Sequence, residues 1–305
     1  MPLPLLDVHR HKVDFRKPDS LHQKCWSDVR PVYNLFTRKS EEGRDLSHLV
    51  ILIHGFNSRP DVWSDGLAEL ILTHDQERKG LGVLVVDWQE GSKWINTWDV
   101  WTDYSHAVKN TRCLARATAL LVQKISPSAS VHCVGHSLGA HVCGFIGNTL
   151  EKSRGKKMAR ITGLDPAGID WTTVRQGIMQ VVPLNPLPHA DTRLDAGDAH
   201  LVDVIHTDGN FAGTMEPLGH VDFYIGRTAA SLGSSQKGCG CLENCDHATS
   251  YRLFAESVKQ QVAVTTVLSC EGPRNYSLYG CEKQEGMEVG YYYGGGKGVV
   301  GMLIE

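Results

Sequence analysis

The sequence contains no long apolar run, and no stretch approaches the roughly 18 residues of a membrane-spanning helix. It also lacks internal repeats, low-complexity linkers and any basic run interleaved with aromatic residues, and its formal net charge is −3. Without a basic surplus, bulk electrostatics cannot hold nucleic acid or a strongly anionic membrane, so we expect no nucleic-acid partner. What is present is a chain of 305 residues with 41% apolar residues, enough for one large core.

The N-terminus lacks the basic lead of a secretory signal, and its apolar patch covers only residues 2–6. Either a signal was removed or omitted, or the protein never had one. Residues 1–30 show no periodicity and are predicted to lie as an N-terminal surface arm. Residues 31–305 are predicted to form a single domain, because α/β folds of this size often do.

The nine cysteines are an odd number, so at least one is expected to stay unpaired or to pair between chains. Cys133 and Cys143 fall on a predicted strand and helix and are interpreted as buried core thiols. Five others gather toward the C-terminus: Cys239, Cys241, Cys245, Cys270 and Cys281. They lack the partner pair or histidines of a zinc site, so disulfide bonds in an oxidising compartment are predicted for them.

Apolar strand-like runs alternate with helix-like segments along the chain. Strands are predicted at 32–37, 49–54, 81–87, 131–135, 160–164, 201–206 and 221–224. Helices are predicted at 60–73, 104–125, 138–150 and 248–258. Uninterrupted apolar strands separated by helices indicate an α/β fold with a largely parallel, buried sheet. In such sheets ligands bind beyond the carboxyl ends of the strands.

The most informative motif is Gly-His-Ser-Leu-Gly at residues 135–139, between a predicted strand and a predicted helix. A Gly-x-Ser-x-Gly turn in this context forces the serine into a cramped backbone conformation and exposes its hydroxyl at the edge of the sheet. Ser137 is therefore the candidate nucleophile. The backbone N–H of Leu138 and that of Phe56, in the loop after His54 and Gly55, are the candidate oxyanion donors.

A serine nucleophile needs a base and a carboxylate that orients the base, and α/β hydrolases supply them in the order Ser, Asp or Glu, His. Asp165 follows the next predicted strand, and His247 stands at the start of a later helix. The competing acids are Asp203, Asp208 and Asp222, and the competing bases are His206 and His220. His136 and His141 flank the nucleophile and are expected to pack locally.

Several linked motifs together resemble the pancreatic lipase family of animal lipases and phospholipases. They are Ile-His-Gly-Phe at 53–56, Gly-His-Ser-Leu-Gly-Ala-His at 135–141, Gly-Leu-Asp-Pro-Ala-Gly at 163–168, the segment 193–208, Gly-His-Val-Asp-Phe-Tyr at 219–224 and Cys-Asp-His at 245–247. The resemblance implies an α/β-hydrolase fold, a mostly parallel central sheet with helices on both faces. It also implies a triad of Ser137, Asp165 and His247, with Phe56 and Leu138 as oxyanion donors.

The same resemblance implies a structural calcium ion but no cofactor for catalysis. Its ligands would be the side chains of Asp195 and Asp198 and the backbone carbonyls of Ala190 and Arg193. Hard oxygen ligands at short spacing suit calcium. The alternative is an acidic, solvated loop.

Two departures from the triglyceride-lipase pattern resemble the phospholipase A1 branch. Only residues 240–244 separate Cys239 from Cys245, where lipases of the family carry a long lid, and the loop 209–218 is also short. So short a lid loop cannot cover an apolar binding groove, and it leaves the serine accessible to a lipid with a head group. No C-terminal β-sandwich domain is expected, and hence no colipase.

The resulting hypothesis is a secreted serine carboxylic-ester hydrolase acting on phospholipids at a membrane or micelle surface, at the sn-1 ester. Acyl chains would lie along Phe56, Phe211 and Met215. The alternatives are a triglyceride or galactolipid lipase or esterase, and a non-catalytic lipid-binding or yolk-storage relative. All three triad positions are filled, which favours an active enzyme.

Overall fold

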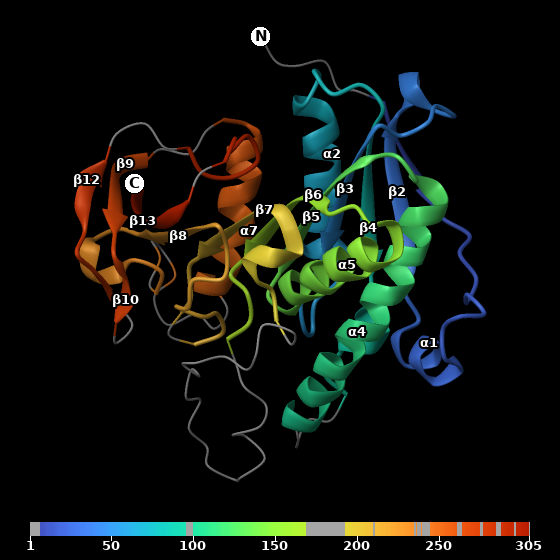
Figure 1. Ribbon diagram of the computed structural model, residues 1–305, viewed down its shortest axis with the longest axis horizontal. Coiled ribbons are helices and arrows are strands. Elements are labelled where there is room, and N and C mark those ends of the chain that lie inside the picture. Colours follow the sequence, from blue (N-terminus) through green and yellow to red (C-terminus); the bar gives the residue numbers. More distant parts are fainter. Residues whose placement is uncertain are drawn as a thin grey trace.

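An 11-stranded sheet forms the centre of the computed structural model of this chain (Figure 1). Its strands are, in chain order, β1 (Val8–Lys12), β2 (Val32–Arg38), β3 (His48–Ile53), β4 (Leu81–Asp87), β5 (Ser130–His136), β6 (Met158–Leu164), β7 (Ala199–His206), β8 (Val221–Gly226), β9 (Val264–Cys270), β12 (Glu282–Gln284) and β13 (Gly298–Ile304). A separate hairpin pairs β10 (Gly272–Arg274) with β11 (Ser277–Tyr279).

The structure describes residues 7–95, 100–168, 193–209, 211–234, 236, 239, 245–260, 264–274, 277–284, 288–295 and 297–304. No helix within these ranges combines the length and the apolar composition needed to cross a membrane.

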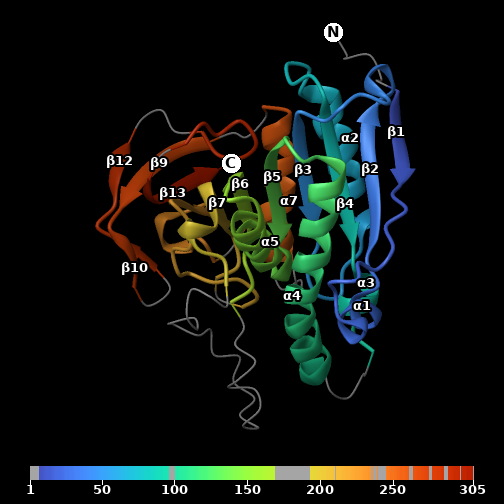
Figure 2. The same cartoon turned by 45° about the vertical axis from the view of Figure 1, so that its right-hand side comes forward.

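The spatial order of the strands is β1-β2-β4-β3-β5-β6-β7-β8-β13-β9-β12. Neighbours from β4 through β13 in this order run parallel, and only the outer strands pair antiparallel. The predicted α/β-hydrolase fold with a mostly parallel sheet is therefore confirmed. All the parallel strands end at one edge of the sheet, and for β3 and β4 this edge faces downward in Figure 2.

Helices cover both faces of the sheet, as the resemblance implied. The helices are α1 (Gln23–Val29), α2 (Ser64–His74), α3 (Gln89–Ser92), α4 (Val100–Ile125), α5 (Leu138–Arg154) and α7 (Cys245–Val258). Successive residues of β3 point to opposite faces: Ile51 joins the core under α4 and α5, and Leu52 joins the core under α2 and α7. Both side chains are fully buried, which explains why the strand is apolar throughout.

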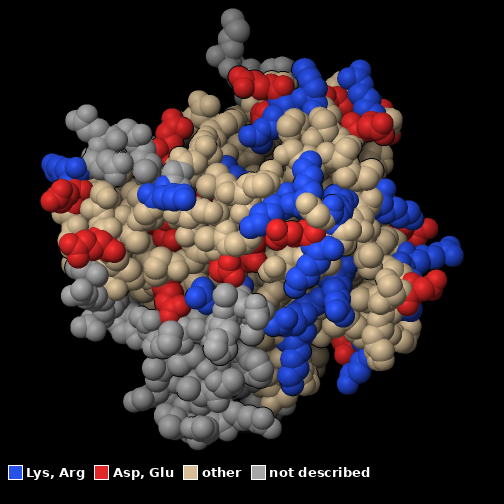
Figure 3. All heavy atoms as spheres, in the orientation of Figure 1, with Lys and Arg blue, Asp and Glu red and all other residues tan. Residues whose placement is uncertain are grey.

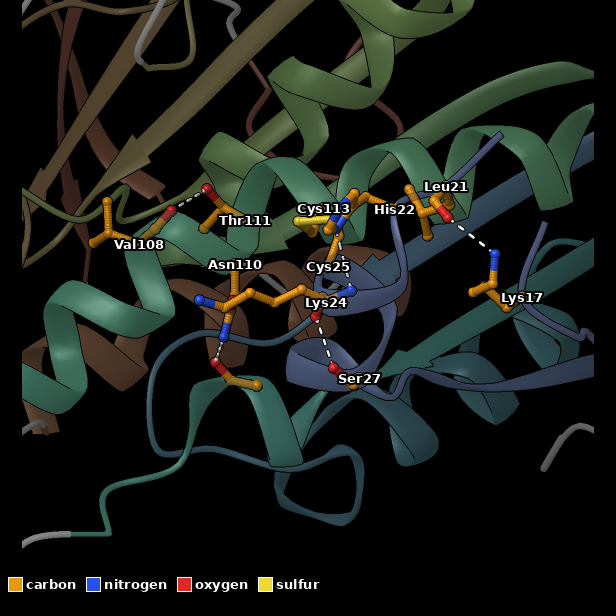
Figure 4. The surroundings of a disulfide bond; sticks show 11 residues. Lys17, Leu21, His22, Lys24, Cys25, Ser27, Val108, Asn110, Thr111 and Cys113 are labelled. Carbon is orange, nitrogen blue, oxygen red and sulfur yellow. Dashed lines mark hydrogen bonds between the residues drawn. A yellow bond between two sulfur atoms is a disulfide. The ribbon is translucent and has the colours of Figure 1, made fainter. Parts of the chain in front are cut away.

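The N-terminal segment differs from the predicted surface arm. β1 pairs with β2 as an edge strand of the main sheet. α1 packs against α4, and a disulfide bond joins Cys25 of α1 to Cys113 of α4 (Figure 4). Four of the five residues of β1 are polar or charged, which suits an exposed edge strand, but so short a segment gives no apolar periodicity to detect.

The interpretation of Cys133 and Cys143 as free core thiols is wrong, because the two residues form a disulfide bond. One lies on β5 and the other on α5, so the bond ties the strand before Ser137 to the helix after it. Disulfide bonds also join Cys239 to Cys245 and Cys270 to Cys281, among the cysteines predicted to be paired. Cys241 lies outside the described residues.

Candidate active site

Ser137 occupies a sharp turn between the end of β5 and the start of α5. Its backbone torsions are φ 57° and ψ −122°, a conformation that L-residues rarely adopt. Its N–H donates a 3.0 Å hydrogen bond to the carbonyl of Leu164, the last residue of β6. The turn therefore holds the serine side chain at the carboxyl edge of the sheet, next to the end of the neighbouring strand.

Glycines make this turn sterically possible. A Cβ atom at Gly135 or Gly139 would overlap backbone atoms of the facing segment, so the strand and helix could not approach as they do. A Cβ at Gly55 would lie 2.6 Å from Cβ of Ser137 and 3.1 Å from its Oγ. The loop after β3 thus passes close to the buried serine side chain, and only glycine leaves room for this approach.

Asp165 and His247 are brought together at the same edge. Nδ1 of His247 lies 2.6 Å from Oδ2 of Asp165, and the carboxylate is fully buried. Oδ1 of Asp165 accepts hydrogen bonds from the N–H groups of Thr207 at 2.7 Å and Asp208 at 3.1 Å. The carboxylate is therefore fixed on both sides, and its bond to Nδ1 leaves Nε2 of the imidazole as the nitrogen that can act as a base.

His136 links this pair to the serine. It precedes Ser137 directly, its ring centroid lies 4.3 Å from that of His247, and its Nε2 donates to the backbone carbonyl of His247 at 3.1 Å. Burial, with His247 nearby, holds the pKa of His136 well below its usual range. Ser137 Oγ makes no hydrogen bond to His247 here, and such contacts often tighten only when substrate binds.

The competing histidines are committed elsewhere. Both ring nitrogens of His206 are engaged, Nδ1 with the carbonyl of Thr214 at 2.7 Å and Nε2 with Asp222 at 2.9 Å. Nδ1 of His220 accepts a hydrogen bond from the N–H of Val202 at 3.0 Å. His206 and Asp222 therefore form a second buried His–carboxylate pair. Because both ring nitrogens of His206 are already hydrogen-bonded, neither can accept a proton from a nucleophile.

The competing acid Asp203 belongs to a structural network. Arg160 forms a bidentate salt bridge with its carboxylate, with N–O distances of 2.7 and 2.8 Å. The predicted local packing of His141 also holds, since its Nε2 lies 2.9 Å from the carbonyl of Ala167. Burial lowers the pKa of His141 to about 4, so this imidazole is neutral in the core.

Asp208 joins the site without direct contact with the serine turn. One oxygen of Asp208, one of Asp165 and a ring nitrogen of His247 all lie within 4.8 Å of one another. Burial, and then the charge of Asp165, raises the pKa of Asp208 to about 7. Because the folded protein retains this proton after the unfolded chain releases it, Asp208 lowers stability as pH rises from about 4 to 7. The site therefore holds one acid whose charge changes near neutral pH.

Gly213 is a part of this site that the sequence motifs did not single out. A Cβ atom there would lie 2.6 Å from both carboxylate oxygens of Asp165. Gly213 also forms an isolated antiparallel bridge with Ala167. The loop after β7 therefore closes over the carboxylate and excludes water from it, which only the folded structure reveals.

The candidate oxyanion donors belong to two different segments, the loop after β3 and the start of α5. Leu138 is the first residue of α5, where N–H groups have no partner within the helix. His54 fixes the loop that carries Phe56, because its Nε2 accepts from the N–H of Trp88 at 3.1 Å and its Nδ1 donates to the carbonyl of Gly55 at 3.0 Å. Within the described residues, the N–H groups of Phe56 and Leu138 have no recorded acceptor, so both are available.

The structure places part of the candidate calcium loop. Asp195 and Asp198 cap η4 (Ala196–Asp198): Oδ1 of Asp195 accepts from the N–H of Gly197 at 2.6 Å, and Oδ2 of Asp198 accepts from the N–H of Asp195 at 3.0 Å. Asp198 is buried, which raises the pKa of its carboxyl to about 7. Ala190 lies outside the described residues. Two adjacent carboxylates, one of them buried, are a donor set that fits a hard cation.

The side chains expected along the acyl chain divide into two groups. Met215 is a core residue, packed with Tyr224 and Leu232, and is not placed to contact substrate. Phe56 is half-buried against Tyr104 of α4, with ring centroids 5.2 Å apart. Phe211 is 48% exposed and is the only one of the three predicted side chains that presents a large apolar surface to solvent.

Charge is unevenly distributed over the surface despite the small net value. Figure 3 shows a column of Lys and Arg side chains down one flank of the molecule. On that flank a groove of about 740 Å³ between α4 and α5 is lined by Arg112, Arg116 and Lys152, and the guanidinium of Arg112 lies over the ring of Phe145 at 4.8 Å. Net charge therefore describes the local field of this protein poorly.

Known proteins show what this chain is similar to. Lipase member H of Danio rerio is 32% identical over 289 residues, which cover 84% of this chain and 56% of that protein. Phospholipase A1 of Vespula squamosa is 30% identical over 250 residues, covering 79% of this chain and 75% of the wasp protein. The chain spans about half the length of the lipase member H relatives it matches.

A solved dienelactone hydrolase-like phosphotriesterase from metagenomic libraries aligns with a TM-score of 0.42 and 12% identity, over 83% of this chain and 98% of that one. So distant a likeness supports no argument about the site. Family membership rests on the sequence itself, because the family model named Lipase matches residues 37–299 of this chain. This chain is a member of the lipase family.

Proposed function

We propose that this protein is a serine carboxylic-ester hydrolase that releases a fatty acid from phospholipids, at the sn-1 ester, as a phospholipase A1 does. The observation that carries the proposal is the convergence of three segments at one sheet edge. The strained turn at Ser137 lies beside the end of β6, and the 2.6 Å Asp165–His247 pair is joined to that turn through His136.

In the proposed reaction Oγ of Ser137 attacks the ester carbonyl carbon while Nε2 of His247 takes the hydroxyl proton. Asp165 holds the imidazole in the tautomer with a proton on Nδ1 and stabilises the imidazolium that forms. The N–H groups of Phe56 and Leu138 donate to the oxyanion. His247 then protonates the departing glycerol oxygen, and water hydrolyses the acyl-enzyme with the same imidazole acting as base.

Two observations support a phospholipid as substrate. Wasp relatives named phospholipase A1 align over three quarters or more of this chain, at about 30% identity. The Cys239–Cys245 disulfide bond joins two cysteines only six positions apart in sequence, and Cys245 comes two residues before His247. So short a segment offers little surface to cover the serine, which leaves room for a head group.

The four large apolar side chains that are exposed among the described residues all lie in connections that follow the carboxyl ends of strands. Val62 follows β3, Trp94 and Ile95 follow β4, and Phe211 follows β7. Ile95 is 70% exposed. Since the serine lies at the same edge, these side chains would enter a lipid surface as the site meets it.

Removing apolar area at this edge tests the surface contact. The double variant Ile95→Ser, Phe211→Ser should lose activity on phospholipid vesicles by roughly tenfold or more, since burying each such side chain is worth about 1.5–3 kcal/mol. Hydrolysis of a soluble short-chain ester should stay at the wild-type rate, because neither residue touches the triad. Equal loss on both substrates would show that the residues act on the site and not on binding to the surface.

The head group is tested by comparing fatty-acid release from phosphatidylcholine with release from triolein and a galactolipid. Phosphatidylcholine carrying different acyl chains at sn-1 and sn-2 also reports the position cleaved. We expect faster release from phosphatidylcholine, and from sn-1. Faster turnover of triolein or galactolipid would replace the phospholipase assignment with the neutral-lipid alternative. No release from any of them, by folded protein, would indicate a non-catalytic relative.

We also propose that Asp195 and Asp198, with backbone carbonyls of Ala190 and Arg193, hold a structural calcium ion. Calcium should then stabilise the fold by about 2.7 kcal/mol at a hundredfold excess over its Kd. Thermal unfolding in EDTA and in calcium measures this, with magnesium as control. In Asp195→Asn the calcium-dependent rise in Tm should disappear. A wild-type Tm indifferent to calcium would rule the site out.

The disulfide bonds support an extracellular site of action. Four of them lie among the described residues, and such bonds persist in oxidising compartments. We therefore infer that the mature protein works outside the cytosol, where lipoprotein, micelle or membrane surfaces present its acyl-lipid substrate.

A further inference from the structure

Edge strand β1 carries two histidines at alternate positions, His9 and His11. In a β-strand such positions lie on one face. The residue between them, Arg10, makes a 2.9 Å ion pair with Asp65 and lies over the ring of Phe36 at 5.4 Å. These contacts anchor Arg10 on the opposite face, so the pleat turns both imidazoles the same way.

A carboxylate from another segment meets the two imidazoles. Glu42 directly follows η1 (Lys39–Glu41), which comes after β2. Its Oε2 lies 3.1 Å from Nδ1 of His9, and its Oε1 lies 3.7 Å from Nε2 of His11. The two rings stand 5.5 Å apart with an interplanar angle of 67°, and a ligand atom of each residue lies within 4.8 Å of the other two. Three donors therefore converge on one point.

The spacing suits a small divalent transition metal. Ligand atoms about 2.0–2.2 Å from a tetrahedral zinc ion lie about 3.4 Å apart. The two imidazoles lie at comparable distances from Glu42, one 3.1 Å from Oε2 and the other 3.7 Å from Oε1. Imidazole nitrogen with one carboxylate selects zinc, copper or nickel, whereas calcium and magnesium prefer oxygen ligands. Three protein ligands leave a fourth position for water.

A simple ion pair explains the cluster less well. All three side chains are partly exposed, at 32%, 46% and 50%, and exposed ion pairs contribute little to stability. An ion pair also requires a protonated imidazole, whereas a metal binds the neutral ring. The adjacent charges, Asp7 and Lys39, are already paired with each other at 2.8 Å.

The cluster lies far from the proposed active site. His9 is in register with Thr37 of β2, Thr37 with Gly82 of β4, Gly82 with Leu49 of β3 and Leu49 with Val131 at the start of β5. Ser137 comes just after the end of β5. The cluster therefore lies at the amino edge of the sheet, on its outermost strand at the upper right of Figure 2, where substrate does not reach.

We propose that His9, His11 and Glu42 bind one divalent transition metal ion of the zinc type, which ties edge strand β1 to the turn after β2. The ion would act as a structural tie on an otherwise open strand edge, and it would take no part in ester hydrolysis.

The test is calorimetric titration of EDTA-treated, untagged protein with zinc chloride, together with Tm measured with and without zinc. We expect one zinc ion per chain and a higher Tm. The double variant His9→Ala, His11→Ala should weaken zinc binding at least tenfold. The single variant Glu42→Gln should also weaken it at least tenfold. The matched double variant His106→Ala, His200→Ala removes two exposed histidines elsewhere and should bind as the wild type does.

The outcomes divide cleanly. Loss of zinc binding in the two cluster variants, with hydrolysis unchanged in all variants, supports the proposal. Failure of the wild type to bind zinc, or binding that survives both cluster changes, overturns it. Zinc that inhibits hydrolysis and still binds the His9→Ala, His11→Ala variant would be at Asp165, Asp208 and His247, the other cluster of candidate ligands, and would also overturn it.

Discussion

Replacing Ser137 with alanine should reduce turnover by a factor on the order of 10⁴ to 10⁶, because the members of a triad act as a unit and the residual rate comes from binding and the oxyanion donors. Alanine has the same Cβ atom as serine, so the strain at φ 57° stays as it is in the wild type and no new clash arises. Because the hydroxyl makes no capping hydrogen bond, its removal leaves no partner unsatisfied, and the free energy of unfolding should change by less than about 1 kcal/mol.

The measurement is the initial rate on phosphatidylcholine vesicles and on a soluble ester, with Tm recorded for the same sample. Unchanged Tm with lost activity on both substrates is the expected result. A variant that keeps most of its activity would remove Ser137 from the reaction. Lost activity together with a large fall in Tm would instead point to damage at the turn, which Ser137→Cys, of nearly the same shape, can check.

Replacing Asp165 with asparagine should lower kcat by about 10⁴ while leaving KM nearly unchanged. The remaining amide oxygen can still accept from the N–H groups of Thr207 and Asp208, so the fold around the position is kept. The amide NH₂ then faces Nδ1 of His247, which forces the proton onto Nε2. An imidazole in that tautomer cannot take the proton of the serine.

The chain offers a matched control in its second buried pair, His206 with Asp222, joined at 2.9 Å. Asp222 also accepts from the N–H of Leu218 at 2.8 Å, so Asp222→Asn tests the same substitution in a similar setting. It should lower stability and leave the rate per folded molecule within a small factor of the wild type. Similar kcat values for the two variants would mean that Asp165 serves only the fold.

The sequence predicts the central part of the fold well, because its signal is local. The parallel strands are continuous apolar runs, since both faces of the sheet are buried, and each run stands out from the polar loops beside it. The rule that parallel strands end at one edge places Ser137 and Asp165 together, because each follows a parallel strand. The choice of His247 comes instead from the order of a hydrolase triad and from the resemblance to the lipase family.

The outer strands could not be predicted in the same way. β13 follows a Gly- and Tyr-rich segment and inserts between β8 and β9. Its parallel partner β8 lies much earlier in the sequence, with β9 and β12 between them. Its Gly298 has a φ of 130°, and its Gly301 packs against Leu232. Interior glycines weaken the strand pattern, so the position of β13 depends on tertiary pairing.

Contacts that depend on side-chain direction were also beyond the sequence. The Cys133–Cys143 bond forms because β5 and α5 pack face to face with these residues opposed, at a Cα separation of 5.7 Å. Likewise His206, a competing base by sequence, is excluded only once both of its nitrogens are seen to be engaged. Gly213 acquires its importance because the β7 loop folds over Asp165.

Whether Ser137 is an activated nucleophile is tested by mass-spectrometric mapping of the protein after reaction with an alkyl fluorophosphonate, which modifies only an activated serine. A single adduct on Ser137, lost in His247→Ala although Ser137 is still present, is the predicted result. An intact, folded protein that takes up no label, or carries it on another serine, would contradict the claim that this turn holds an activated nucleophile.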